Sequence, residues 1–150
     1  MVIAYVDGSA KAPSLSDHTN FVSAWACVIK HGKKTTILAD YVPSRTSKAG
    51  NVVTTGPIIA EYLALENCLR YLKAMGVYQF ILRYDLDDFE RAFSGKEVKR
   101  HRKPPMEILR ERIRTYGIVP YLEYTRKNEA HRVAKRLVLK KFKEIEGMQS

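Results

Sequence analysis

The sequence Ile-Ala-Tyr-Val-Asp-Gly-Ser at residues 3–9 decides the fold that we expect for this chain. Its apolar residues suit a strand covered on both faces, and we predict that this strand spans Val2 to Asp7. The glycine and serine that follow are expected to turn the backbone away. A carboxylate at the end of a buried strand costs free energy unless a cation meets it. Asp7 is therefore the first candidate ligand of a metal ion.

The rest of the chain predicts a mixed α/β sheet. Hydrophobic patterns predict strands over residues 2–7, 21–30, 35–42, 77–85 and 119–124. Helices are expected over residues 57–75, 87–93, 106–116 and 128–145, with Asn128 as the cap of the last. Polar stretches predict loops over 10–20 and 43–56, the pair Pro104-Pro105 is expected to break the chain before the third helix, and residues 146–150 are expected to fray. The first three strands should form an antiparallel meander, and two crossovers should place the last two strands parallel to the first.

Two further carboxylates fall at matching places in this topology. Glu61 lies near the start of the first long helix, on the stripe that faces the sheet, and Asp85 ends the fourth strand. Ligands of such sheets gather at the carboxyl ends of parallel strands, so we expect Asp7, Glu61 and Asp85 to meet there. Oxygen ligands select Mg²⁺ or Mn²⁺, and two such ions can cleave a phosphodiester bond. Taken singly, each residue has a structural alternative: Asp7 as a turn former, Glu61 as a carboxylate favoured by the helix dipole, and Asp85 as a helix cap.

Composition favours one domain with a polyanionic partner. The chain has 150 residues with 45% hydrophobic content, and we expect residues 1–150 to form a single domain. Its 26 Lys and Arg against 16 Asp and Glu give a net charge of +10, which fits nucleic acid, although a solvated lysine-rich surface is an equal alternative. Without an apolar run long enough for a membrane span or a signal peptide, we expect a cytoplasmic monomer that does not bind membranes. Cys27 and Cys68 lack metal-site spacing and are expected to fill the core.

Three segments resemble the successive motifs of the type 1 ribonuclease H family. They are residues 3–9, Ala-Glu-Tyr-Leu-Ala-Leu at 60–65, and Phe-Ile-Leu-Arg-Tyr-Asp at 80–85. The predicted order of strands and helices is similar too. The resemblance implies a ribonuclease H-like fold, in which a five-stranded mixed sheet is flanked by helices. It also implies an endonuclease that cuts the RNA strand of RNA–DNA hybrids without sequence preference, with double-stranded RNA as a further candidate substrate.

The same resemblance assigns the residues of the site. It implies that Asp7, Glu61 and Asp85 bind two divalent ions, Mg²⁺ or Mn²⁺, and catalyse the reaction. The fourth acidic position of the family corresponds to His131, whose imidazole can bind Mn²⁺ or move a proton, so His131 is both a candidate ligand and a candidate catalytic residue. The alternative is a histidine on the helix surface. Asp88 and Glu129 are less well placed candidates for a fourth ligand.

Basic and hydroxyl side chains supply the candidate substrate contacts. The basic run at residues 96–103 lies where some family members carry a longer basic extension that holds the hybrid, although a solvated loop is the alternative. The candidate substrate-binding residues are Ser9, Thr54, Thr55, Lys96, Lys99, Arg100, Arg102 and Lys103. The missing fourth acid motivates a second hypothesis, a nucleic-acid-binding domain that keeps the fold without catalysis. A third is a related nuclease that acts on branched DNA.

Overall fold

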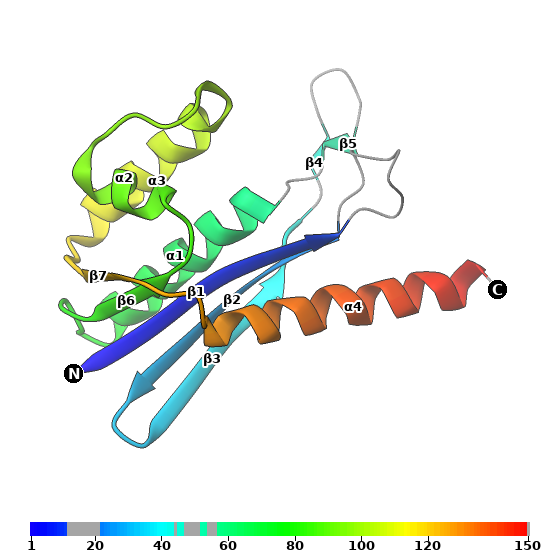
Figure 1. Ribbon diagram of the computed structural model, residues 1–150, viewed down its shortest axis with the longest axis horizontal. Coiled ribbons are helices and arrows are strands. Elements are labelled where there is room, and N and C mark those ends of the chain that lie inside the picture. Colours follow the sequence, from blue (N-terminus) through cyan, green and yellow to red (C-terminus); the bar gives the residue numbers. More distant parts are fainter. Residues whose placement is uncertain (12–21, 44, 47–51, 54–56, 150) are drawn as a thin grey trace.

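The computed structural model describes residues 1–11, 22–43, 45–46, 52–53 and 57–149 (Figure 1). Its main sheet has the strand order β3-β2-β1-β6-β7. The strands are β1 (Val2–Lys11), β2 (Val22–His31), β3 (Lys34–Tyr41), β6 (Ile81–Tyr84) and β7 (Tyr121–Tyr124). The pairs β1–β2 and β2–β3 are antiparallel, whereas β1–β6 and β6–β7 are parallel. The predicted five-stranded mixed sheet is confirmed.

Helices cover both faces of this sheet. They are α1 (Pro57–Ala74), α2 (Asp88–Ser94), α3 (Lys103–Tyr116) and α4 (Glu129–Gln149). Helix α1 packs on one face of β1 and β2, with α3 against α1, while α4 packs on the other face (Figure 1). The alternation of β1 explains the two layers: Val2, Ala4 and Val6 belong to the core under α1, and Ile3 and Tyr5 contact the core under α4.

Strand β1 does not end at Asp7, contrary to our prediction. It continues through Gly8 and Ser9 to Lys11, because β2 keeps pairing with it as far as Val22. Gly8 therefore does not turn the chain. A Cβ atom on Gly8 would lie 2.6 Å from both the Ala60 Cβ and the Glu61 nitrogen, so the missing side chain allows α1 to approach β1 closely. The predicted loop at residues 10–20 is thus wrong for its first two residues, and residues 12–20 lie outside the described part.

The two parallel strands are shorter than predicted. We expected them to begin at Val77 and Val119, but β6 begins at Ile81 and β7 at Tyr121. On the β1 side, Ile81 already pairs with Ile3, the second residue of β1, so β1 offers almost no chain to continue the ladder. On the β7 side, two backbone hydrogen bonds extend beyond the strands, from the Val119 N–H to the Tyr78 carbonyl over 3.3 Å and from the Tyr121 N–H to the Phe80 carbonyl over 2.8 Å. Asp85, which we predicted to be the last residue of this strand, lies one residue beyond the end of β6.

Three other predicted boundaries differ from the structure: one loop contains two short strands, and helices α3 and α4 are longer than predicted. Within the predicted loop 43–56, Arg45–Thr46 and Val52–Val53 pair as the short strands β4 and β5. Pro104-Pro105 does not break the chain but lies in the first turn of α3, where the N–H groups have no helical partner anyway. Helix α4 extends past its predicted end at residue 145 to Gln149, and Gly147 within it lacks the positive φ with which a glycine commonly ends a helix.

Two further expectations concern the core and the membrane. Cys27 and Cys68 are both free and fully buried, and they belong to the core between α1 and the sheet. Among the helices of the described segments, none combines the length and the apolar character that crossing a membrane requires.

Candidate metal centre

Three carboxylates from three elements meet beside β1. Oxygen atoms of Asp7, Glu61 and Asp85 all lie within 4.8 Å of one another. Asp7 comes from β1, beyond its pairing with β6, Asp85 from the end of β6, and Glu61 from the second turn of α1. The prediction that these three side chains come together is therefore confirmed, although Asp7 stands within a strand and not at its end.

The close approach at Gly8 explains how acids from two layers reach each other. Asp7 alternates with Gly8, so its side chain points to the α4 face, whereas Glu61 belongs to the helix on the opposite face. Because Gly8 has no side chain, the backbone of α1 at Ala60 and Glu61 lies directly against β1. Glu61 can therefore contact Asp7 at the edge of the parallel part of the sheet.

The cluster lacks counter-charge from lysine or arginine. Asp7 is 2% exposed and Glu61 is 9% exposed. Among the described residues, no lysine or arginine forms an ion pair with any of the three acids; the one basic partner is His131, whose Nδ1 lies 3.0 Å from Asp7 Oδ2. The backbone N–H of Gly8 also donates to Asp7 Oδ1 over 2.9 Å. Two buried acids thus face each other with little protein charge to balance them.

Their pKa values record this imbalance. Burial, together with hydrogen bonding to Asp7 and Asp85 and their negative charges, raises the pKa of Glu61 to about 10. Burial also raises the pKa of Asp7, against the opposing effects of the hydrogen bonds from Glu61 and Gly8 and of His131. Without a cation, Glu61 therefore keeps its proton at neutral pH. Three converging oxygen donors that need positive charge fit a hard divalent ion.

The start of α4 places His131 beside this cluster. Asn128 donates from Nδ2 to the Val6 carbonyl over 2.7 Å, and its Oδ1 accepts from the Ala130 N–H over 3.0 Å. The predicted cap is confirmed, and the same side chain also ties the helix to β1 next to Asp7. Sequence reasoning missed this second role, because it depends on a contact across 122 positions. His131 is consequently held near Asp7, although its side chain is 57% exposed.

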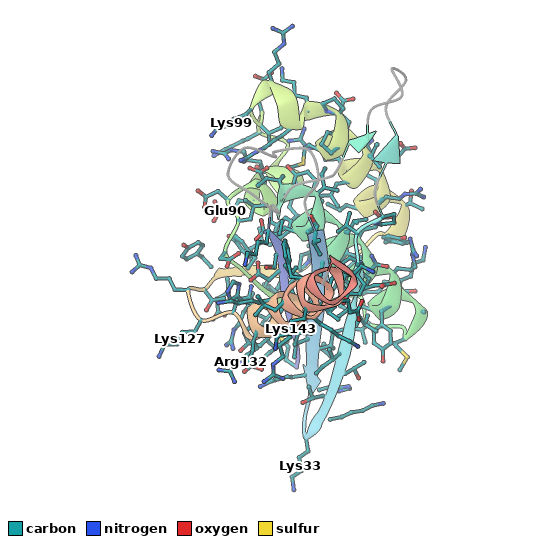
Figure 2. All side chains as sticks on the ribbon, turned by 90° about the vertical axis from the view of Figure 1, so that its right-hand side faces the viewer. Lys33, Glu90, Lys99, Lys127, Arg132 and Lys143 are labelled. Carbon is teal, nitrogen blue, oxygen red and sulfur yellow. The ribbon has the colours of Figure 1, made fainter. Side chains whose placement is uncertain are left out.

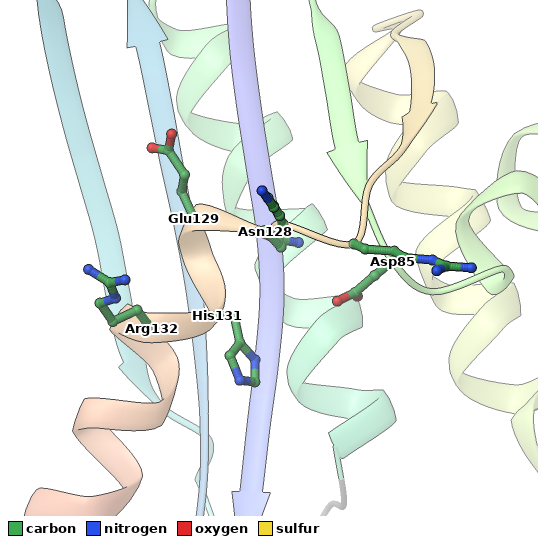
Figure 3. A pocket seen from close by; sticks show the side chains of 7 residues that line it. Asp85, Asn128, Glu129, His131 and Arg132 are labelled. Atoms are coloured by element: carbon green, nitrogen blue, oxygen red, sulfur yellow. The ribbon is translucent and has the colours of Figure 1, made fainter.

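A cleft opens from the cluster toward α4. Its volume is about 760 Å³, and its lining consists of Asp85, Arg126, Lys127, Asn128, Glu129, His131 and Arg132. Figure 3 shows His131 over the β1 ribbon, with Asp85 to the right of the ribbon and Arg132 to the left. Glu129, one alternative for a fourth ligand, forms an ion pair with Lys30 over 2.7 Å.

The predicted basic run divides into two parts. Lys96, Lys99, Arg100 and Lys103 are exposed. Arg102 instead pairs with the fully buried Asp88, with 3.0 Å between Nη1 and Oδ1. Asp88 also contacts Arg91 over 3.4 Å and accepts a hydrogen bond from Tyr62. Asp88, the other alternative for a fourth ligand, therefore has its own cations and belongs to a separate structural cluster.

The remaining candidate substrate contacts are placed only in part. Ser9 lies on β1 opposite Ala24, two residues beyond Asp7 and half-buried. Because residues two apart on a strand share a face, Ser9 lies on the same face as Asp7. Thr54 and Thr55 lie outside the described residues, so their assignment stays a prediction.

Comparison with known proteins identifies the fold. No family model matches the chain, and no curated protein matches it by sequence. Solved structures do match. The RNase H1 of the halophilic archaeon Halobacterium salinarum has a TM-score of 0.61 at 19% identity, with 95% of this chain and 98% of that chain covered. LC11-RNase H1, solved in complex with an RNA/DNA hybrid, has a TM-score of 0.65 at 18% identity over 93% and 95% of the two chains.

A third match extends over nearly the whole chain. The N-terminal RNase H domain of rv2228c from Mycobacterium tuberculosis has a TM-score of 0.66 at 13% identity and covers 99% of this chain and 98% of that chain. At such identities the likeness concerns the arrangement of strands and helices. The chain has the fold of type 1 ribonucleases H, which confirms the predicted fold class.

Proposed function

We propose that this protein is a metal-dependent endonuclease that hydrolyses the RNA strand of RNA–DNA hybrids. The observation that carries the proposal is the cluster of Asp7, Glu61 and Asp85, with oxygen atoms within 4.8 Å and no lysine or arginine bound to them among the described residues. The fold supports the substrate class, since one protein of the same fold is solved with such a hybrid. Recognition would depend on helix shape and the 2′-hydroxyl, so cleavage should not depend on sequence.

In this proposal Asp7, Glu61 and Asp85 would hold two divalent ions, Mg²⁺ or Mn²⁺. Bound divalent ions stabilise charge on the phosphate and lower the pKa of bound water. Asp7, between Glu61 and His131, would ligate through its two oxygens, Asp85 would ligate from the open cleft, and Glu61 would lose its proton when it ligates. His131 would assist as a ligand or by moving a proton from its Nε2 or Nδ1.

The exposed part of the basic run would hold the hybrid. Lys96, Lys99, Arg100 and Lys103 are exposed and would contact phosphates, which supplies affinity without sequence information. Arg102 would support these contacts indirectly, because its ion pair with Asp88 fixes the start of α3. Ser9, beside Asp7, is the proposed contact nearest the acids.

A labelled hybrid incubated with the purified protein in MgCl₂ and in MnCl₂ tests the proposal. We expect cleavage of the RNA strand that EDTA abolishes. Asp7→Asn should lower the rate by about 10³-fold, because direct metal ligation is worth several kcal/mol in the transition state. Asp40→Asn, an exposed acid on β3, is the control and should cleave normally. Cleavage that persists in EDTA or in Asp7→Asn would refute the metal site.

One observation favours a second candidate, a nucleic-acid-binding domain without catalysis. His131 occupies the place of an acid in the resemblance and is largely exposed. Tight binding of the hybrid with no cleavage in any divalent ion would support this alternative. The same panel, extended to double-stranded RNA and branched DNA, decides the substrate class.

A further inference from the structure

The segment from residue 126 to residue 143 carries the most one-sided charge of the chain. It contains eight lysines and arginines and one acid, Glu129. That acid is already neutralised by Lys30, over 2.7 Å. The segment comprises the loop that lines the cleft and the first three-quarters of α4. A concentration of positive charge therefore begins at the candidate metal centre and leads away from it.

Helical spacing gathers four of these side chains into one line, which we call the basic ridge: Arg132, Arg136, Lys140 and Lys143. The spacing of four, four and three residues places them on one side of the helix. Ala130, Ala134 and Val138 are buried on the other side, against the sheet. All four ridge residues are exposed. The ridge therefore faces away from the sheet along α4.

Seven lysines and arginines elsewhere in the described segments have carboxylate partners, whereas the ridge residues have none there. Arg70 pairs with Glu66, Arg83 with Glu123, and Arg112 with Glu66, over distances of 3.1–3.5 Å. Within the described residues, no ridge side chain forms an ion pair, and the nearby Glu144 is bound by Lys141 over 3.7 Å. Four adjacent cations that repel one another are costly in the free protein, and a polyanion would relieve that cost.

The ridge is continuous with the cleft. Arg132 lines the cleft beside His131 and is also the first residue of the ridge (Figure 3). From Arg132 to Lys143 the helix rises about 16 Å, which corresponds to roughly five phosphate steps along one strand of a duplex. Figure 2, in which α4 is seen nearly end-on, shows Arg132 and Lys143 on this helix and Lys33 at the distant tip of the β2–β3 hairpin.

We infer that the basic ridge binds the sugar–phosphate backbone of the nucleic acid where it extends beyond the candidate metal centre. This inference rests on the proposed function for its substrate, a hybrid seated at Asp7, Glu61 and Asp85. The ridge contacts phosphates alone and so adds affinity without sequence preference. It makes binding of a long substrate stronger, and more dependent on salt, than binding of a short one.

The test compares two charge-matched double variants. Arg136→Gln/Lys140→Gln removes two ridge charges, keeps good helix formers and leaves Arg132 in the cleft. Lys33→Gln/Lys34→Gln removes two exposed charges at the other end of the sheet, where His31 lies opposite Val2. Binding of fluorescent hybrids of about 8 and about 30 base pairs is measured in EDTA across a salt series.

We expect the ridge variant to bind the long hybrid roughly tenfold more weakly, with a log–log salt slope that is less steep by about 2. Its binding of the short hybrid should stay within about twofold of wild type, and the hairpin variant should match wild type for both. Equal slopes in the ridge variant and wild type would overturn the inference. The inference would also be overturned if the ridge variant lost binding to vesicles of anionic lipid but bound the long hybrid as wild type does. Failure of wild type to cleave the hybrid, with the ridge effect intact, would count against the proposed function alone.

Discussion

Two buried carboxylates in this protein have opposite surroundings. Asp88 is 1% exposed and is met by Arg102, Arg91 and the hydroxyl of Tyr62. Asp7 is 2% exposed and is met by Glu61, Asp85 and one histidine. Burial is the same, but the protein supplies the balancing charge at one site and withholds it at the other. The comparison teaches that the missing counter-charge, more than burial, marks the candidate metal centre.

The largest effect on folding should come from breaking the Asp88 cluster. Arg102→Gln leaves a buried carboxylate with one arginine fewer, and we expect the free energy of unfolding to fall by about 3 kcal/mol. Urea denaturation measures this loss. Arg100→Gln, an exposed neighbour, is the matched control and should be neutral. A wild-type midpoint in Arg102→Gln would mean that this ion pair contributes nothing to stability.

Substitution of Glu61 should have a smaller effect on the free energy of unfolding, and should raise it in the metal-free protein. Its raised pKa, about 10 against 4.5, means that the metal-free folded protein keeps a proton that the unfolded chain loses above pH 4.5. The free energy of unfolding should therefore fall as the pH rises from about 4.5 toward 10. Glu61→Gln removes this dependence, so the metal-free variant should exceed wild type by more than about 1 kcal/mol at pH 8.

Thermal unfolding in EDTA at several pH values checks this prediction. Glu107→Gln, an exposed residue of α3, serves as the control and should follow wild type. Addition of MgCl₂ or MnCl₂ should stabilise wild type more than Glu61→Gln, because a cation that binds only the folded state shifts the equilibrium toward it. If the unfolding temperatures of wild type and Glu61→Gln changed with pH in parallel, the raised pKa of Glu61 would be contradicted.

The smallest effect should come from His131. Its contact with Asp7 over 3.0 Å is open to solvent, so His131→Ala should slow cleavage by about tenfold, as for residues that orient metal ligands. His131→Asp should recover activity at lower MnCl₂, since it adds an oxygen ligand. Rates are measured across a metal titration, with Glu144→Gln, an exposed acid of the same helix outside the cleft lining, as the control. An unchanged rate in His131→Ala would make it a surface histidine.

The sequence predicted those features that depend on local pattern. The strand order follows from hydrophobic periodicity and crossover rules, and the meeting of residues 7, 61 and 85 follows from that order. The end of β1 was wrong because an Asp-Gly-Ser triplet looks like a turn, whereas pairing with β2 carries the strand through it. Local composition cannot show whether a neighbouring strand continues.

Charge partners were the other feature beyond sequence reasoning. The run at residues 96–103 looks uniformly available, yet Arg102 is held by Asp88, which lies 14 positions away in the sequence and on another helix. The basic ridge was missed because its residues are spread over 12 positions and gather only on a helix that packs by its opposite side. Both cases depend on which acids the fold brings close.

The bare backbone at Gly8 has a consequence for the tuning of the acidic cluster. Any larger residue there would act as a wedge between strand and helix, since its first carbon would stand 2.6 Å from Ala60 and Glu61. The distance between Asp7 and Glu61 therefore depends on residue 8 having only a hydrogen atom as its side chain. Redesign of ion preference in this protein would therefore begin with residue 8 and not with the carboxylate ligands, because the distance between β1 and α1 sets the size of the site that those ligands can form.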